Sequence, residues 1–199
     1  MSSVADGRAT PETPSSSLLF LDLDDVIALN THYTGRDAAR AVNQPTRVPP
    51  DFHERLFARG AVAALNQLLS EFRPRVVLTT SWLRLLERNG FLSLFEHGGV
   101  HVGADDLHPV WEAPEIYGLG RGASIQRWLA KHYRGEDVLI LDDDCSGATL
   151  RETPWMRQGH VLLCQEGVGF HNGLLDAARA AFRTPFGPRS VWNPPPRLR

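Results

Sequence analysis

The sequence predicts an α/β protein with a three-layer, Rossmann-like fold, in which helices cover both faces of a central, mostly parallel sheet of five strands. Two observations predict this class. Short apolar runs alternate along the chain with longer amphipathic stretches, and a helix between successive strands is what parallel pairing requires. The chain has 199 residues, of which 42% are hydrophobic and 22% charged, a composition typical of one globular domain.

Five segments are expected to form the strands. Four of them are short and apolar at consecutive positions, which is typical of strands buried on both faces: residues 18–23, 75–80, 138–142 and 160–164. Residues 98–102 carry a weaker signal of the same kind and are the fifth candidate.

Four segments repeat apolar residues at helical spacing and are expected to form the flanking helices. The longest, residues 51–72, places Leu56, Leu65 and Leu68 near one face. The others are residues 81–91, 122–133 and 171–182. Strands and helices together predict one folded domain over residues 18–183.

The two ends of the chain differ from this pattern. Residues 1–17 are mostly Ser, Thr, Pro, Gly and Ala, which predicts a disordered segment because so little apolar surface can be buried. Residues 184–199 are rich in Pro and Arg and predict an extended tail. Its arginines could contact RNA, but a solvated tail is the simpler interpretation.

Charge and composition exclude several classes of function. With 21 basic and 23 acidic residues the net charge is −2, so we expect no strong global affinity for nucleic acid or an anionic membrane. No apolar run approaches the roughly 20 residues of a membrane-spanning helix, and the first residues lack the pattern of a secretory signal. Two cysteines cannot form a disulfide framework, which favours a cytoplasmic location.

Acidic residues follow two of the predicted strands. Asp22 and Asp24 end the first strand and lie on the same side of it, and Asp142 and Asp143 end the fourth. Because ligands of open α/β sheets bind beyond the carboxyl ends of the strands, we expect these side chains near one site. A single Asp there is often only a turn or cap residue, but clustered carboxylates favour a hard divalent cation, with Mg²⁺ as the first candidate.

Hydroxyl groups follow the second predicted strand. Thr79, Thr80 and Ser81 lead into a helix, and the free N–H groups at a helix N-terminus favour an anion. Ser81 also fits the simpler role of a helix N-cap, and Trp82 is interpreted as a core or edge aromatic. A metal among carboxylates that faces hydroxyl groups and a helix end predicts a phosphate site.

These motifs resemble those of a known superfamily. The segments LFLDLDDVIAL, VVLTTSW and VLILDDD resemble, in order and spacing, the first, second and fourth motifs of the haloacid dehalogenase (HAD) superfamily. In finer detail, TTSW together with GRGASIQRWL and LILDD is similar to the HAD domain of Swiss Army knife RNA repair proteins. The resemblance spans about residues 18–164 and implies the HAD fold.

The resemblance implies a Mg²⁺-dependent phosphatase that hydrolyses phosphate monoesters through an aspartyl phosphate. Asp22 would be the nucleophile, and Asp24 would act first as general acid and then as general base. Asp142 and Asp143 would hold Mg²⁺ together with Asp22 and the main-chain carbonyl of Asp24. Asp25 departs from the family pattern, which often has Gly there, but Asp tolerates tight backbone geometry.

The resemblance also implies groups that bind the phosphate. Thr80, assisted by Ser81, would hydrogen-bond the phosphoryl oxygens. The basic residue of the third motif fits Arg121 best, because it opens the helix before the fourth strand. Arg127 and Lys131 are the other candidates, although a solvated helix face explains them more simply.

The insertions in which this superfamily carries a cap are short here. Residues 28–50 and 103–120 are too short for a separate domain, so we expect a minimal cap, a flap over residues 28–50, and an open site. An open site suits a phosphorylated substrate that is bulky, such as a nucleic-acid end or a protein, and also admits nucleotides. The flap bears His32, Tyr33, Arg36, Arg40 and Arg47. Its arginines could bind a second phosphate, but solvated loop charges are the simpler interpretation.

Two alternatives stay open. The first is a non-catalytic HAD-like domain that binds metal or phosphate, although the presence of every expected acidic residue argues against it. The second is a metal-dependent nucleic-acid enzyme of the topoisomerase-primase type. That arrangement calls for a glutamate on the first strand, where this chain has Asp22 and Asp24.

Overall fold

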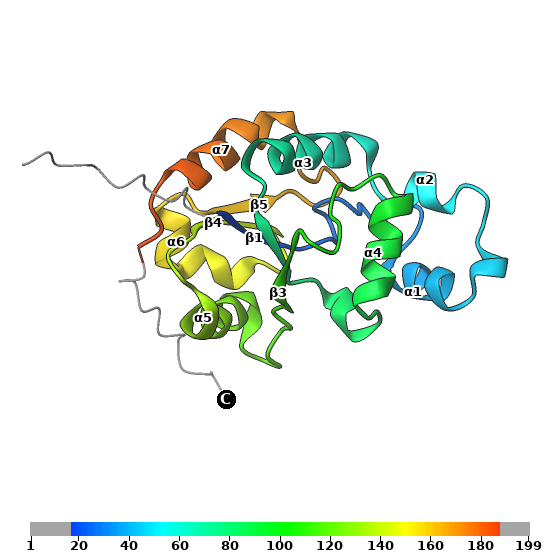
Figure 1. Ribbon diagram of the computed structural model, residues 1–199, viewed down its shortest axis with the longest axis horizontal. Helices are drawn as coiled ribbons and strands as arrows, with labels where there is room; N and C mark the ends of the chain where they lie inside the picture. Colours follow the sequence, from blue (N-terminus) through cyan, green and yellow to red (C-terminus); the bar gives the residue numbers. More distant parts are fainter. Residues whose placement is uncertain (1–16, 188–199) are drawn as a thin grey trace, which may run out of the picture.

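The computed structural model describes residues 17–187 and contains a five-stranded sheet in the order β3-β2-β1-β4-β5. Every strand pair is parallel. The strands are β1 (Ser17–Leu21), β2 (Arg75–Leu78), β3 (Leu107–Glu112), β4 (Asp137–Asp143) and β5 (Val161–Cys164). The predicted α/β class with a parallel, Rossmann-like sheet is therefore confirmed (Figure 1).

The strand order places a topological switch point at β1. The chain builds β2 and β3 on one side of β1, then crosses over to add β4 and β5 on the other side. In open α/β sheets, ligands bind at such a switch point, beyond the carboxyl ends of the strands, which here are those of β1 and β4.

Alternation along β1 divides the core into two layers. Leu19 and Leu21 pack with α3 (Arg59–Phe72) and α7 (Leu175–Arg183), and Leu18 and Phe20 pack with α5 (Gly120–His132) and α6 (Pro154–Arg157). Figure 1 shows these helix pairs on opposite faces of the sheet. Because both faces are covered, the strand has to be apolar at every position, which is the pattern found in the sequence.

The chain between β1 and α3, called the flap from here on, is a small helical insertion that includes residues 28–50, for which a flap was predicted. It contains α1 (Gly35–Asn43), the 3₁₀ helix η1 (Pro45–Arg47) and α2 (Phe52–Leu56), and it packs beside α4 (Arg88–His97) at one end of the molecule (Figure 1). Ala38 of α1 is fully buried in the core. Three more 3₁₀ helices complete the described structure: η2 (Ser81–Arg84), η3 (Ala148–Glu152) and η4 (Asn172–Leu174).

The prediction of a strand at residues 98–102 is wrong. Gly98 ends α4, and Gly99 has a φ of +73°, so the chain turns there instead of extending. The strand lies at Leu107–Glu112, inside the stretch 103–120 that was interpreted as an insertion. It is the edge strand of the sheet, and an edge strand tolerates Pro109 because one side of its backbone is unpaired.

Two predicted helices are interrupted. Residues 51–72 form α2 and α3, separated at Phe57 and Ala58, which are both extended. Phe57 is buried and stacks on Trp82, and the N–H of Ala58 donates to the carbonyl of Ile27, so tertiary contacts override helical spacing here. Residues 81–91 likewise divide into η2 and the start of α4.

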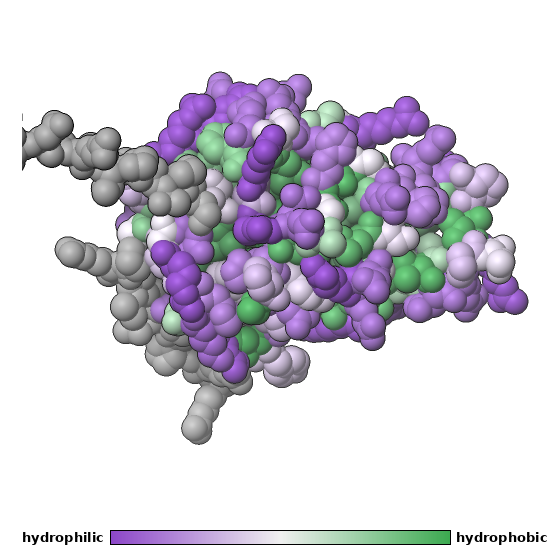
Figure 2. All heavy atoms as spheres, viewed as in Figure 1, coloured by the Kyte–Doolittle hydropathy of each residue, from purple (hydrophilic) through white to green (hydrophobic). Residues whose placement is uncertain are grey.

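The surface agrees with a globular fold. Figure 2 shows polar side chains over most of the visible face, with apolar ones in small areas between them. The large exposed apolar residues are few among residues 17–187: Leu85, Val110, Tyr117 and Val168. No described helix has the length and apolar character needed to cross a membrane.

The predictions for the chain ends fall largely outside the described residues, since 1–16 and 188–199 are not described. Within the described part, Ser17 already belongs to β1. Phe186 is buried against Tyr133, Trp155 and His160. Among the described residues, Ser17 is therefore already part of the sheet, and the packed structure continues beyond α7.

Candidate active site at the carboxyl ends of the strands

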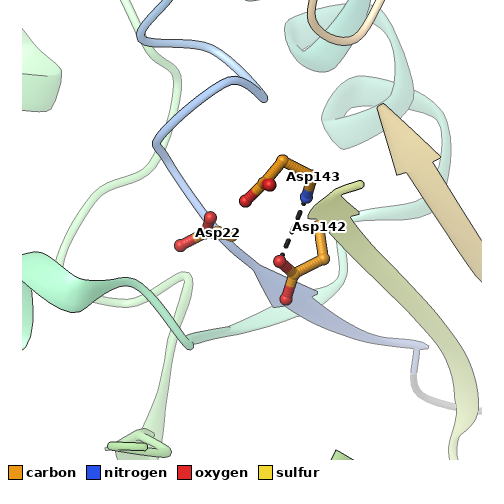
Figure 3. Close-up of side chains that lie close together, drawn as sticks. All are labelled: Asp22, Asp142 and Asp143. Atoms are coloured by element: carbon orange, nitrogen blue, oxygen red, sulfur yellow. Dashed lines mark hydrogen bonds between the residues drawn. The ribbon is translucent and has the colours of Figure 1, made fainter. Parts of the chain in front are cut away.

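The acidic residues predicted from the sequence meet at the switch point. Leu21 of β1 is in register with Leu141 of β4, and the N–H of Asp22 donates to the carbonyl of Leu141 at 3.0 Å. Asp22 therefore lies beside Asp142, and Asp143 follows directly. Figure 3 shows the three side chains gathered in one space beyond the strands.

The three carboxylates form a compact and buried cluster. Each of Asp22, Asp142 and Asp143 offers an oxygen, and these oxygens all lie within 4.8 Å of one another. The exposed fractions of the three residues are 1%, 0% and 5%. Three carboxylates that are this close together and shielded from solvent repel one another when ionised, so the cluster requires bound protons or nearby cations to be stable.

Arg121 supplies one of the opposing charges. It stands in the first turn of α5, is 3% exposed, and places Nε 2.7 Å from Asp142 Oδ2 and Nη2 3.3 Å from Asp22 Oδ1. The nitrogen atoms are not aligned for hydrogen bonds to these two carboxylates, so the contacts are ion pairs. Of the three basic candidates on α5, Arg121 is the one in the cluster. Arg127 and Lys131 are exposed and line a pocket of about 420 Å³ beside β3.

Burial dominates the proton affinities at the site. It raises the pKa of the Asp22 carboxyl well above the usual range, and neighbouring carboxylates, Asp142 first among them, raise it further against the effect of Arg121. Burial likewise raises the pKa of Asp142 to about 6. The pKa of Arg121 is also raised, because the attraction of Asp142 and Asp22 outweighs the cost of burying its charge. The single guanidinium of Arg121 therefore does not balance the negative charge of the three carboxylates when all are ionised.

The cluster fits a divalent cation. Asp22 Oδ1 and Asp142 Oδ2 are buried and, apart from their ion pairs with Arg121, have no hydrogen-bond partner among the described residues, so each oxygen retains a lone pair for a ligand. Carboxylate oxygens are the ligands that Mg²⁺ prefers, and a cation would offset the repulsion among the three carboxylates. Asp22, Asp142 and Asp143 are therefore the residues that could hold it.

Ser146 belongs to the site and was not found from the sequence. Its hydroxyl lies 2.7 Å from Asp142 Oδ1 and 3.5 Å from Asp22 Oδ2, also contacts Asp143 Oδ2, and accepts from Arg121 Nη2 at 3.3 Å. The turn after β4 places it there, since Asp143 Oδ1 accepts from the N–H groups of Cys145 and Ser146. No motif marked this serine; only its position three residues after Asp143 was a signal.

Asp24 lies outside the cluster of three. Its carboxylate accepts three hydrogen bonds: from Asn30 Nδ2 at 3.1 Å to one oxygen, and from Ser81 Oγ at 3.1 Å and Trp82 Nε1 at 2.9 Å to the other. The side chain therefore faces the flap and the turn after β2. Asp25, where the superfamily often has Gly, has a φ of +50°, a left-handed conformation that Asp tolerates.

The turn after β2 is arranged differently from the prediction. The helix that follows is a 3₁₀ helix of only four residues, η2, so the expected helix-end attraction for an anion is much reduced. Thr80 accepts a hydrogen bond from the N–H of Trp82, and Ser81 donates to Asp24. Thr79 is fully buried, and its hydroxyl has no hydrogen-bond partner among residues 17–187.

Several flap side chains are engaged within the flap. Tyr33 donates to Asp51, which also pairs with Arg55, and Arg40 pairs with Asp37. The guanidinium of Arg55 in turn contacts the ring of His32. These contacts hold the flap together and favour a structural role for most of its charges.

A parallel Rossmann-like sheet with carboxylates after β1 and β4 and hydroxyl groups after β2 agrees with the motifs by which the sequence resembles the HAD superfamily. The family model described as the HAD domain in Swiss Army Knife RNA repair proteins matches residues 18–173. This chain belongs to that family, as its motifs predicted. A search of curated proteins found no match, and a search of solved structures found none either.

Proposed function

We propose that this chain is a Mg²⁺-dependent phosphatase that hydrolyses phosphate monoesters through an aspartyl phosphate on Asp22. The observation that carries the proposal is the buried cluster of Asp22, Asp142 and Asp143 with Arg121 ion-paired to two of its members. Membership in the HAD family supports the same chemistry and disfavours the topoisomerase-primase alternative.

Asp22 is the proposed nucleophile. One carboxylate oxygen attacks phosphorus, the bond from phosphorus to the leaving oxygen breaks, and the phosphoryl group is left on Asp22. Arg121 holds the carboxylate in place and offsets negative charge on the equatorial oxygens. Asp22, Asp142 and Asp143, together with the main-chain carbonyl of Asp24, would hold Mg²⁺, which would supply the remaining positive charge that an anionic nucleophile needs to approach a phosphate dianion.

Asp24 is the proposed acid and base. It gives a proton to the leaving oxygen in the first step, and in the second step it takes a proton from the water that attacks the aspartyl phosphate. Inorganic phosphate is released and Asp22 returns to its starting state. Thr80 and Ser81 are proposed to hydrogen-bond the phosphoryl oxygens as the phosphate binds.

The proposed substrates are nucleotides or phosphorylated nucleic-acid ends. The flap is a short helical insertion and not a domain-sized cap, which favours a site that a large phosphorylated molecule can reach. The family to which the chain belongs is described by its occurrence in RNA repair proteins, and this supports a nucleic-acid end. The net charge of −2 indicates that affinity has to come from the site itself.

The test is hydrolysis of p-nitrophenyl phosphate and of 5′- and 3′-phosphorylated oligonucleotides, with and without Mg²⁺. We expect phosphate release that requires Mg²⁺ and falls at least about 10³-fold in Asp22→Asn, because the amide cannot form the covalent intermediate. The matched control is Asp105→Asn, an exposed acid, which should keep full activity. Phosphate-analogue binding without turnover would favour the non-catalytic alternative.

A further inference from the structure

We infer that Trp82 is a positioning residue for Asp24 and that the flap holds Trp82 in this role through Gly35. The inference rests on the proposed function, in which Asp24 is the acid and base. It extends that function by assigning a task to a buried aromatic residue and to the first residue of α1.

The contact between Trp82 and Asp24 differs from the other two contacts of the same carboxylate. Trp82 is 1% exposed, and its indole N–H donates to Asp24 Oδ2 at 2.9 Å. A buried indole N–H cannot turn to water, so it has to keep this partner. Asn30 and Ser81 are exposed and can exchange their hydrogen bonds with solvent. Trp82 is therefore the fixed donor of the three.

The indole itself is held from several sides. Its backbone N–H bonds the Thr80 hydroxyl, and its ring stacks on Phe57 with the centroids 6.3 Å apart. Gly35, the first residue of α1, lies against the edge that carries the N–H. A Cβ added at Gly35 would stand 2.4 Å from Trp82 Nε1 and 2.6 Å from Cδ1. Gly35 thus has no side chain because the indole occupies that space.

This arrangement connects the flap to the acid. If α1 carried a side chain at its first residue, the indole would have to move, and the hydrogen bond to Asp24 would lengthen or break. The carboxylate would then keep only the two donors that solvent can replace. Its position relative to the leaving oxygen would become less defined, which weakens proton transfer more than it weakens binding of the phosphate.

Two substrates with different leaving groups distinguish a positioning role from a purely structural one. Loss of a purely structural residue would slow both substrates to a similar extent. An alkoxide leaving group needs the proton from Asp24, whereas p-nitrophenolate is stable enough to leave almost without it. Misplacing Asp24 should therefore slow a substrate with an alkoxide leaving group far more than p-nitrophenyl phosphate. The ratio of kcat/KM for p-nitrophenyl phosphate to kcat/KM for benzyl phosphate, a substrate of similar size, measures this difference up to formation of the aspartyl phosphate.

The experiment measures that ratio in two variants. Trp82→Phe removes the N–H and keeps an aromatic ring, and Gly35→Ala leaves the N–H but displaces it. We expect the ratio to rise about 10-fold or more in both, as a partial loss of the 10²–10⁴-fold effect of general acid catalysis. Gly60→Ala in α3, where an added Cβ meets nothing within 4 Å, and Trp155→Phe, at a buried tryptophan of α6, should leave the ratio unchanged.

A second measurement tests the contact without turnover. In protein labelled with ¹⁵N-tryptophan, the indole resonance that disappears in Trp82→Phe should shift in Asp24→Ala and in Gly35→Ala, and should not shift in Gly60→Ala. The inference is overturned if the Trp82 indole resonance keeps its chemical shift in Asp24→Ala. It is also overturned if Trp82→Phe lowers kcat/KM equally for both substrates. A wild-type chain that releases no phosphate from either substrate instead contradicts the proposed function, and the positioning role with it.

Discussion

Asp22 and Asp24 are two residues apart, but they belong to two regions built on different principles. Asp22 lies in the buried cluster at the ends of β1 and β4, where three carboxylates face one guanidinium. Asp24 lies toward the flap, where neutral donors from Asn30, Ser81 and Trp82 surround one carboxylate. The first region is arranged around charge and the second around hydrogen bonds.

The two environments suit the two roles proposed for the motif, nucleophile for Asp22 and acid and base for Asp24. Environments that separate the behaviour of neighbouring carboxyl groups are a common basis for assigning distinct chemical roles. Here the strand ends set the first environment, and the turn after β2 and the flap set the second. Substitutions that act on one region only test whether the two regions behave independently.

The largest effect is expected from removing the guanidinium of the cluster. Arg121→Met removes the guanidinium that pairs with Asp22 and Asp142 in the buried cluster, which should lower the free energy of unfolding by about 3–5 kcal/mol in metal-free buffer. Urea denaturation measures this value. Arg127→Met on the exposed face of the same helix is the control and should stay within about 0.5 kcal/mol of the wild type. Equal values for the two variants would contradict the charge-based account of the cluster.

A smaller effect is expected when Mg²⁺ is added. At a concentration about 100 times its Kd, a ligand that binds only the folded state stabilises by about 2.7 kcal/mol, which corresponds to a rise in Tm on the order of 5–10 °C for a chain of this size. The rise should disappear in Asp143→Asn and persist in Asp24→Asn, because the side chain of Asp24 lies outside the cluster. If Mg²⁺ no longer raised the Tm of Asp24→Asn, the side chain of Asp24 would belong to the metal site, and the separation of the two regions would be wrong.

The smallest effect concerns an exposed charge pair outside both regions. The hydrogen bond from Arg179 lowers the pKa of Glu71 to about 2. A folded-state pKa below the unfolded value stabilises at pH above the ordinary value of about 4.5, and the contribution is lost as the pH falls toward 2. Glu71→Gln should therefore flatten the acid side of the plot of Tm against pH slightly. Glu166→Gln, at an exposed acid, should leave that slope as in the wild type.

Much of the cluster could be predicted because parallel strands bring their carboxyl ends to one edge. Asp22 and Asp142 needed only the prediction of two buried strands and the rule that ligands bind beyond them. Arg121 was the preferred basic candidate because it opens α5, and a residue in the first turn of that helix lies beside the strand ends.

Three other features could not be predicted, for different physical reasons. Trp82 was interpreted as a core or edge aromatic, and its burial agrees, but nothing local indicates that its N–H meets Asp24. Ser146 reaches the carboxylates through the geometry of a turn. The strand at Leu107–Glu112 was missed because an edge strand that contains a histidine, a proline and a glutamate lacks the continuous apolar run that identified the buried strands.

The buried Phe186 and the start of β1 have a consequence for how the molecule can be attached to something larger. Ser17 begins the central strand, and the carbonyl of Phe186 accepts from Tyr133, which ends α5 on the same side of the sheet. The described chain therefore begins and ends near the amino ends of the strands, on the side of the molecule away from the carboxylates. A tether, tag or fused module joined at either point would lie on the side of the molecule away from Asp22, Asp142 and Asp143, and would leave the proposed active site unobstructed.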